Sequence, residues 1–347
     1  MSAPASGNFD CARLQEIKAK LNSAFVNNGV VDADMTADVA SLRMAQDIQT
    51  ATFTPLQDPN KDNFVKLVWL DNCSEDAAEE CSTDECAIDG VEGGTQCADY
   101  ELDICLESPG FKVTEKKFRG MGNTIDMDME VARMLARELQ KMDQGLANTW
   151  VSKLDSWGGE NLNTSPYTVS STSTAIPAAA WNPDVFGYLS VTRMRNKMPN
   201  MKLLLGGLME QYFWKIANET STGEGQNNAR KVGSLGTVYS DMFTIESELG
   251  SKAAFLINPD SIAFVTKAYY SPYGSGRVVP ISGGGHQTLY TIRSLALPGV
   301  VYDVIYQEVC EGNDIVHTWK LKVKAGMFLN PTGCNTDRTG VLKFLCA

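Results

Sequence analysis

The longest helical pattern in this chain, from Asp126 to about Trp157, does most to limit its fold. Apolar residues recur there every three or four positions, which places them along one side of an α-helix. They are Val131, Leu135, Leu139, Met142, Leu146, Trp150, Val151 and Leu154. At 1.5 Å per residue the helix would be a rod of roughly 45 Å, with Gly145 as its one weak position. A chain organised around such a rod is not an all-β protein.

The first turn of this predicted helix carries three alternating acids, Asp126, Asp128 and Glu130. Alternating carboxylates could bind a metal ion. They also complement the positive end of the helix dipole, which by itself explains acids in a first turn. We therefore interpret them as a helix start and predict no metal there.

The acidity of the chain is concentrated in one segment, from Asp71 to Cys105, which contains no lysine or arginine. Its acids are Asp71, Glu75, Asp76, Glu79, Glu80, Asp84, Glu85, Asp89, Glu92, Asp99, Glu101 and Asp103. The whole chain has 42 acids and 30 bases, so these twelve acids equal the formal net charge of -12 and the rest is balanced. Such an insert between apolar β-like runs is typical of a protruding loop rather than a pocket.

Five of the nine cysteines lie in the acidic segment: Cys73, Cys81, Cys86, Cys97 and Cys105. Their gaps of seven, four, ten and seven residues contain no C-x-x-C pair, so the spacing does not favour zinc. Two other interpretations stay open. The thiols are free on a half-exposed loop, or they form disulfides late, within the loop or between neighbouring copies, after the protein leaves a reducing cytosol.

Length and composition indicate two or more compact subdomains, because 347 residues at 43% hydrophobic content suffice for a substantial core. The first ten residues have neither the basic nor the apolar region of a secretion signal, and no run approaches the ~20 apolar residues of a membrane span. We expect a soluble protein that is made and first folded in a cytosol.

A charged β-hairpin is predicted at the end of the acidic segment. Gln96 to Glu107 alternates in hydrophobicity, Ser108-Pro109-Gly110 is typical of a turn, and Phe111 to Arg119 returns with basic residues. The apolar face of its first strand consists of Tyr100, Leu102, Ile104 and Leu106. Because an isolated hairpin is marginal in water, this face needs another surface, and we expect it to contact a neighbouring subunit.

The remaining pattern divides into helical, α/β and β regions. The predicted helices are Phe9 to Asn28, Ala33 to Ile48, 182 to about 197, Leu208 to Asn218 and Ser261 to Ala268. The predicted strands are Phe64 to Leu70, Met201 to Leu205, Ala253 to Ile257, Val300 to Cys310, Ile315 to Lys324 and Gly340 to Leu345. A polar loop is expected up to about Leu249. Of the β-strands near the end, 300–310 and 315–324 form a hairpin across Glu311 to Asp314.

Signatures of common enzymes are missing from the sequence. The chain has two histidines: His317 lies on the apolar face of a predicted strand, where a structural role is expected, and His286 follows three glycines without the lysine of a P-loop. There is no G-x-S-x-G, H-E-x-x-H or dinucleotide motif. Net acidity without a basic cluster also argues against binding nucleic acid through its phosphates. We predict no catalytic residue and no cofactor.

The order of elements resembles that of tailed-bacteriophage major capsid proteins, whose fold also occurs in encapsulins and herpesvirus shell floors. Locally, Ala254 to Asp260 is similar to an axial-domain step from strand through Asn-Pro, and 326–331 with 342–344 look like late segments of such proteins. The resemblance implies an α+β fold: an N-terminal arm (1–56), an extended β-hairpin loop (57–120), a peripheral domain with a long spine helix (121–180 and 296–347) and an α/β axial domain (181–295).

What the resemblance implies for function is assembly. The protein would be a major capsid protein, assembled in the cytoplasm of a bacterial host into pentamers and hexamers of an icosahedral virion shell that encloses double-stranded DNA without sequence-specific contacts. Its partners would be further copies of itself, a portal, and a scaffold or decoration protein. Calcium bridging by the acidic loop is a rival to late disulfides as a stabiliser.

Three alternatives remain beside this interpretation. An encapsulin-like compartment would have the same fold with different contents. Another self-assembling phage protein, such as a tail-tube subunit, should be mostly β and does not suit the long helix. A cytosolic enzyme with an acidic regulatory insert would need a pocket with perturbed titratable groups.

Overall fold

The computed structural model describes residues 39–49, 52–55, 63–70, 95–118, 127–158, 164–170, 173–196, 198, 200–219, 238–270, 277–281, 285–297, 299–330 and 340–347. The chain divides into two compact units, and the fold is α+β. One unit comprises Met1–Arg43, Leu102–Thr149 and Val265–Gly326, and the other comprises Met44–Glu101, Trp150–Phe264 and Met327–Ala347. The predicted helix at 9–28 and residues 71–94 of the acidic segment lie outside the described residues. None of the helices in the described ranges is both long and apolar enough to cross a membrane.

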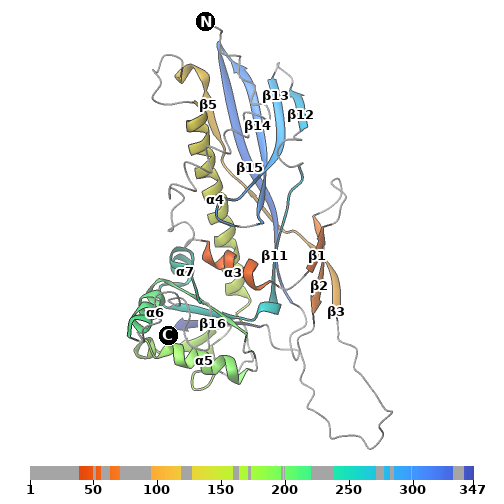
Figure 1. The fold of residues 1–347 in the computed structure, drawn as a ribbon. Helices are drawn as coiled ribbons and strands as arrows, with labels where there is room; N and C mark the ends of the chain where they lie inside the picture. The colour runs from red at the N-terminus through yellow and green to blue at the C-terminus, as the bar shows by residue number, and fades with distance from the viewer. Residues whose placement is uncertain are drawn as a thin grey trace, which may run out of the picture. The chain divides into compact units, whose positions relative to one another are not determined.

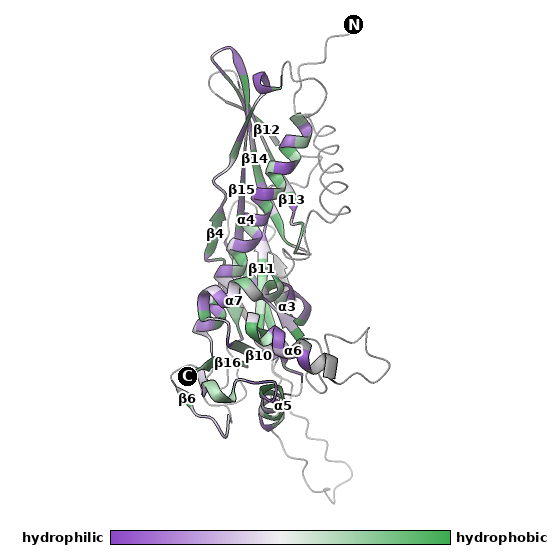
Figure 2. Ribbon diagram, turned by 90° about the vertical axis from the view of Figure 1, so that its left-hand side faces the viewer, coloured by the Kyte–Doolittle hydropathy of each residue, from purple (hydrophilic) through white to green (hydrophobic). Residues whose placement is uncertain are grey.

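The first unit contains most of the predicted long helix, α4 (Met127–Ser156). Its apolar stripe is buried as the spacing predicts: Val131, Leu139 and Leu146 have no exposed surface. Figure 2 shows the resulting alternation of hydrophilic and hydrophobic residues along α4. The prediction of one long amphipathic helix is confirmed.

A seven-stranded sheet, most of which belongs to this unit, lies beside α4 (Figure 1), in the order β11-β15-β14-β13-β12, with β4 and β5 also paired to β15. Its strands are β4 (Ile104–Glu107), β5 (Phe111–Thr114), β11 (Ile262–Lys267), β12 (Arg277–Ile281), β13 (Gly285–Arg293), β14 (Val301–Glu311) and β15 (Asp314–Leu329). The long strands run side by side in Figure 1. The predicted hairpin of β14 and β15 is confirmed, since Glu311 pairs with Asp314 across Gly312, which has the left-handed φ of 67°.

The predicted charged hairpin is wrong. β4 pairs with 322–325 of β15, and β5 pairs with 316–319 of the same strand, so the chain continues along β15 instead of folding back. Ser108 joins the two strands by donating its backbone N–H to Leu321 O at 2.9 Å and accepting the Leu321 N–H on Oγ at 3.0 Å. Ser108-Pro109-Gly110 therefore interrupts the pairing along one edge of β15 instead of forming a hairpin turn. The long strand β15 offers both β4 and β5 backbone hydrogen bonds, which a hairpin of β4 with β5 would replace by fewer.

The second unit is built on a six-stranded sheet, in the order β6-β7-β16-β10-β8-β9. Its strands are β6 (Val169–Ser170), β7 (Ser173–Ile176), β8 (Lys202–Leu205), β9 (Val238–Ser240), β10 (Ala253–Ile257) and β16 (Val341–Cys346). Its helices are α5 (Val185–Arg195), α6 (Gly207–Glu219) and α7 (Met242–Leu249). All of β10 is buried, and its Leu256 belongs to a core with Leu189 of α5 and Phe344 of β16.

The same unit contains a second, three-stranded sheet of β1 (Thr52–Pro55), β2 (Phe64–Leu70) and β3 (Thr95–Glu101). The prediction of a strand at Phe64 to Leu70 is confirmed. The short helix α3 (Ala40–Ile48) matches the second half of the predicted helix from Ala33. Three 3-10 turns, η2 (Glu115–Lys117), η3 (Ala178–Ala180) and η5 (Pro259–Ser261), complete the described elements.

Three further predictions from the sequence, a helix, a loop and the partner of the last strand, are wrong. The helix expected at Ser261 to Ala268 is the single turn η5 followed by β11, because Ile262, Phe264 and Val265 favour a buried strand. The expected loop before Leu249 contains β9 and α7. The last strand, β16, pairs with β10 and β7, so residues 341–346 do not belong to the sheet of β14 and β15, although the resemblance places 296–347 together in one peripheral domain.

Candidate functional site

The residues predicted to contact a neighbouring subunit are largely covered by the chain itself. Leu102 and Ile104 are 1% and 7% exposed, and Leu106 is half-buried against Gly145 of α4. Tyr100, in β3 of the second unit, accepts a hydrogen bond from Trp69 Nε1 at 3.0 Å and is half-buried. The expectation that this face lacks cover is wrong, because β4 joins a sheet rather than a free hairpin. A contact between copies at these residues stays a prediction.

The cysteine predictions fall mostly outside the described residues. Cys73, Cys81 and Cys86 lie there, and Cys97 is described only as a backbone position in β3 that pairs with Val68. Cys105 is an exposed free thiol in β4. Disulfides that form late remain a prediction.

The carboxylate of Glu107 forms the centre of a charged group on the sheet. It accepts hydrogen bonds from Lys320 Nζ at 2.5 Å and from Lys322 Nζ at 2.9 Å. These two hydrogen bonds, together with the positive charges, lower the pKa of Glu107 to about 2. The lysines that pair with the acid of β4 therefore come from β15 and not from β5, the strand that follows in sequence.

Replacing Lys320 by methionine should raise the pKa of Glu107 toward the ordinary glutamate value, because the first hydrogen bond to the carboxylate is lost. The measurement is an NMR titration of labelled glutamate side-chain carboxyls. Lys112→Met is the control, since Lys112 pairs with Glu311 instead. An unchanged midpoint for Glu107 in Lys320→Met would refute the arrangement.

His317 lies fully buried in β15 with partners on both ring nitrogens. Nδ1 is 2.7 Å from the Tyr306 hydroxyl, and Nε2 is 3.2 Å from Glu115 Oε1. The Tyr306 hydroxyl also lies 3.0 Å from Glu308 Oε2, to which it donates. This network joins β14, β15 and η2, which confirms the structural role predicted for the histidine.

The first unit also contains a buried carboxylate, Asp143 on α4, which sequence reasoning did not single out. It accepts hydrogen bonds from Ser294 Oγ at 2.8 Å and from the Tyr302 hydroxyl. Burial raises the pKa of Asp143 to about 6, although these hydrogen bonds favour the charged form. A signal was present in the sequence: position 143 is four residues after Leu139 and so lies on the buried side of the helix.

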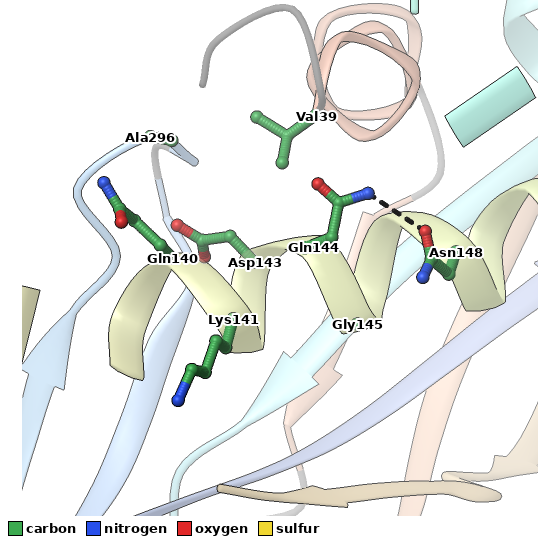
Figure 3. Close-up of a pocket in the computed structure, with 8 residues that line it drawn as sticks. All are labelled: Val39, Gln140, Lys141, Asp143, Gln144, Gly145, Asn148 and Ala296. Atoms are coloured by element: carbon green, nitrogen blue, oxygen red, sulfur yellow. Dashed lines mark hydrogen bonds between the residues drawn. The ribbon is translucent and has the colours of Figure 1, made fainter. Parts of the chain in front are cut away.

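A cavity of about 400 Å³ opens beside Asp143. Its lining consists of Val39, Gln140, Lys141, Asp143, Gln144, Gly145, Asn148 and Ala296. In Figure 3, Gln140 and Asp143 point toward the segment of Ala296, Lys141 points away, and Gln144 donates to Asn148 at 3.0 Å. Asp143 is engaged by hydroxyls of the chain, and no group of three or more His, Cys, Asp or Glu residues suited to a metal ion occurs in the described ranges. The cavity therefore has the features of a helix–sheet junction and presents no recognisable catalytic set.

Comparisons with known proteins give distant structural matches. A chain of the cyanophage A-1(L) capsid asymmetric unit has 11% sequence identity and a TM-score of 0.45, covering 82% of this chain and 88% of that chain. The capsid of Ralstonia phage GP4 has 12% sequence identity and a TM-score of 0.42, and the match covers 82% of this chain and 83% of that chain. This chain is similar to bacteriophage capsid structures. A chain from Mycobacterium phage Che8 has 9% identity and a TM-score of 0.42, covering 85% and 92%.

No protein-family model and no curated protein matches the sequence. Identities and TM-scores as low as those of the phage structures mark a distant similarity that does not carry a function.

Proposed function

We propose that this chain is the major capsid protein of a tailed bacteriophage and that it assembles through pentamers and hexamers into an icosahedral shell around double-stranded DNA. One observation carries the proposal: the 30-residue helix α4 buries its stripe beside a sheet built on the long strands β14 and β15. In chain order, β2 and β3 precede this helix and an α/β unit follows it. This is the order implied by the sequence resemblance.

Within the proposal, the two units take the parts of a shell subunit. The sheet of β14 and β15 with α4 forms the peripheral domain, and the sheet of β10 and β16 with its helices forms the axial domain. Residues 1–56 would be the N-terminal arm and 57–120 would contain the extended loop. Such a subunit needs no catalytic residue or cofactor, because its activity is the formation of contacts between copies.

The charge of the chain suits this function. Outside the acidic segment the chain has 30 acids against 30 bases, so a wall built from it would be close to neutral and the packaged DNA could move along it without sticking. Sequence-specific DNA binding is not expected. A portal and a scaffold or decoration protein would be further partners, and the place of assembly would be the cytoplasm of the bacterial host.

The test is the assembly state of the purified chain, measured by negative-stain electron microscopy and by light scattering for mass. We expect closed shells, or pentamers and hexamers that convert to shells. A chain that stays monomeric or dimeric with every candidate scaffold would contradict the proposal. Particles isolated from their natural source should contain nuclease-protected DNA, whereas an encapsulin-like compartment would contain protein.

A further inference from the structure

The buried histidine of β15 takes part in more hydrogen bonds than its uncharged form can supply. Its Nδ1 lies 2.7 Å from the Tyr306 hydroxyl, and its Nε2 lies 3.2 Å from Glu115 Oε1. The Tyr306 hydroxyl donates to Glu308 Oε2 at 3.0 Å. All four residues belong to the first unit. We call the side chains of Glu115, Tyr306, Glu308 and His317 the His317 network.

The protons of the network can be counted from these contacts. A tyrosine hydroxyl has one proton, and Tyr306 gives it to Glu308, so the Tyr306 oxygen accepts from Nδ1 of the ring. An ionised Glu115 can only accept, so Nε2 donates to it. Both ring nitrogens then carry hydrogen, which makes His317 a positively charged imidazolium.

A neutral ring would keep only two of the three hydrogen bonds. With hydrogen on Nε2 alone, the Tyr306 hydroxyl has to turn to Nδ1, and Glu308 loses this donor. With hydrogen on Nδ1 alone, the bare Nε2 faces the carboxylate of Glu115. A protonated Glu115 that donates to Nε2 would hold the same additional proton, so this proton belongs to the network as a whole. The full set of contacts therefore requires it.

Two carboxylates beside the ring favour the additional proton. Glu115 lies 3.2 Å from Nε2, and Glu308 lies 3.9 Å from Nδ1. With the proton the network has one net negative charge, and without it the network has two. Burial of the ring acts in the opposite direction, but opposite charges in direct contact favour the charged form. The side chains of Glu115 and Glu308 are 18% and 23% exposed, so a proton can reach the network from solvent.

Further ionisable groups lie on the elements around the network. His286 of β13 is exposed and pairs in register with Glu308, and the β5 partner of His317 is the apolar Val113. Exposed charges of this kind are screened by salt. The others, on η2 and on the first turns of α4, are Lys116, Lys117, Asp128, Glu130 and Arg133. Of these, Glu130 pairs with Arg133, and the buried Asp128 has the same sign as Glu115 and would also favour the proton.

We propose that the His317 network is a pH-sensitive latch, which binds one proton more tightly than an exposed histidine does and thereby fastens η2 to the sheet. In chain order η2 lies between β5 and α4, so the latch acts on the segment that leads into the long helix. Its contribution to stability is present in full below the ordinary histidine value of about 6.5 and is lost at the higher pH where the folded chain releases the proton. The inference does not depend on the proposed function, because the network lies within one unit of one chain.

The proton itself can be observed by NMR of the unassembled chain with nitrogen-labelled histidine rings. The chain has two histidines, and His286→Gln identifies the signals of His317. We expect both ring nitrogens of His317 to carry hydrogen at about pH 6 and the midpoint of its titration to lie above about 6.5. Hydrogen on one ring nitrogen at that pH, or a midpoint below that value, would overturn the proposal.

Glu115→Gln tests what holds the proton. The glutamine keeps an oxygen that can accept from Nε2 and removes the negative charge. The proton affinity of His317 should fall at least about tenfold, because its charged partner is lost. Glu311→Gln is the matched control and should leave this affinity unchanged, since Glu311 pairs with Lys112. Equal midpoints of His317 in wild type and Glu115→Gln would reject the latch.

The fastening of η2 is measured by cleavage with trypsin after its two exposed lysines, Lys116 and Lys117. Below the wild-type midpoint, Glu115→Gln should be cut several times faster than wild type. Above this midpoint the two rates should converge, because wild type has also released its proton. Comparing both proteins at the same pH removes the pH dependence of trypsin. Equal rates below the midpoint would show that the proton does not fasten η2, which would also overturn the proposal.

Discussion

Replacing Asp143 by asparagine should remove a pH-dependent cost of folding. The pKa of Asp143 is raised from 3.8 to about 6 by burial, so the folded chain binds the proton more tightly than the unfolded chain. This binding stabilises the protein fully below pH 3.8, and the contribution is lost as the pH rises through about 6. The amide introduced by Asp143→Asn cannot ionise, yet it can still accept from Tyr302 and donate to Ser294.

The measured quantity is the free energy of unfolding of the unassembled chain, from denaturant titrations at several pH values. Between about pH 4 and about pH 7, the difference between Asp143→Asn and wild type should shift by about 2.4 kcal/mol in favour of the variant. Any loss of hydrogen-bond strength that does not depend on pH cancels in this comparison. A difference that stays constant with pH would show that Asp143 is not buried as described.

Glu130→Gln is a control of opposite sign. Its hydrogen bonds with Arg133 at 2.6 and 2.8 Å lower the pKa of Glu130. The contribution of Glu130 to stability is therefore present above its unfolded pKa and is lost as the pH falls. The difference between this variant and wild type should move in the direction opposite to that of Asp143→Asn.

The second large effect is expected for Gly110→Ala. Gly110 has a φ of 79°, which side chains disfavour, and an added Cβ would lie 2.6 Å from Trp319 O. The backbone at this point is the break between β4 and β5, so either this break or β15 has to move. We expect a loss of about 3 kcal/mol or more in the free energy of unfolding.

Gly299→Ala separates the two causes of this loss. Gly299 has a similar φ of 83°, but a Cβ there meets no atom within 4 Å. This control should lose only about 1–2 kcal/mol, the cost of a left-handed conformation. Urea unfolding followed by tryptophan fluorescence gives both values, and equal losses would contradict the close packing of Gly110 on β15.

Elements whose signal is local in the sequence were predictable. The stripe of α4 repeats over many turns, so its helical form and its buried side follow from spacing alone. The turn at Gly312 joins two strands that are neighbours in sequence, and this hairpin was also predictable. For α4 the helical spacing of apolar residues is contained in one segment, and for the hairpin the two paired strands follow each other directly in the sequence.

Predictions failed where the partner of a strand is distant in sequence. The alternation from Gln96 to Glu107 was recognised, but it belongs to two strands with different partners, β3 with β2 and β4 with β15. The run from Ile262 to Lys267 forms a strand whose partner is β15, about fifty residues later in the chain, so its β-branched and aromatic residues alone did not reveal its state. The last strand likewise joined β10, which lies far earlier in the chain.

The sequence by itself therefore determined the long helix, the position of its buried stripe, the β14–β15 hairpin and the concentration of acid in one segment. These properties depend on periodicity and on composition, which are readable one residue after another. Only the tertiary structure decided which strands pair, which acids meet bases, as at Glu107, and which carboxylates are buried, as at Asp143. The physical reason is that hydrogen-bond pairing and desolvation depend on groups far apart in the chain, whose meeting no local pattern specifies.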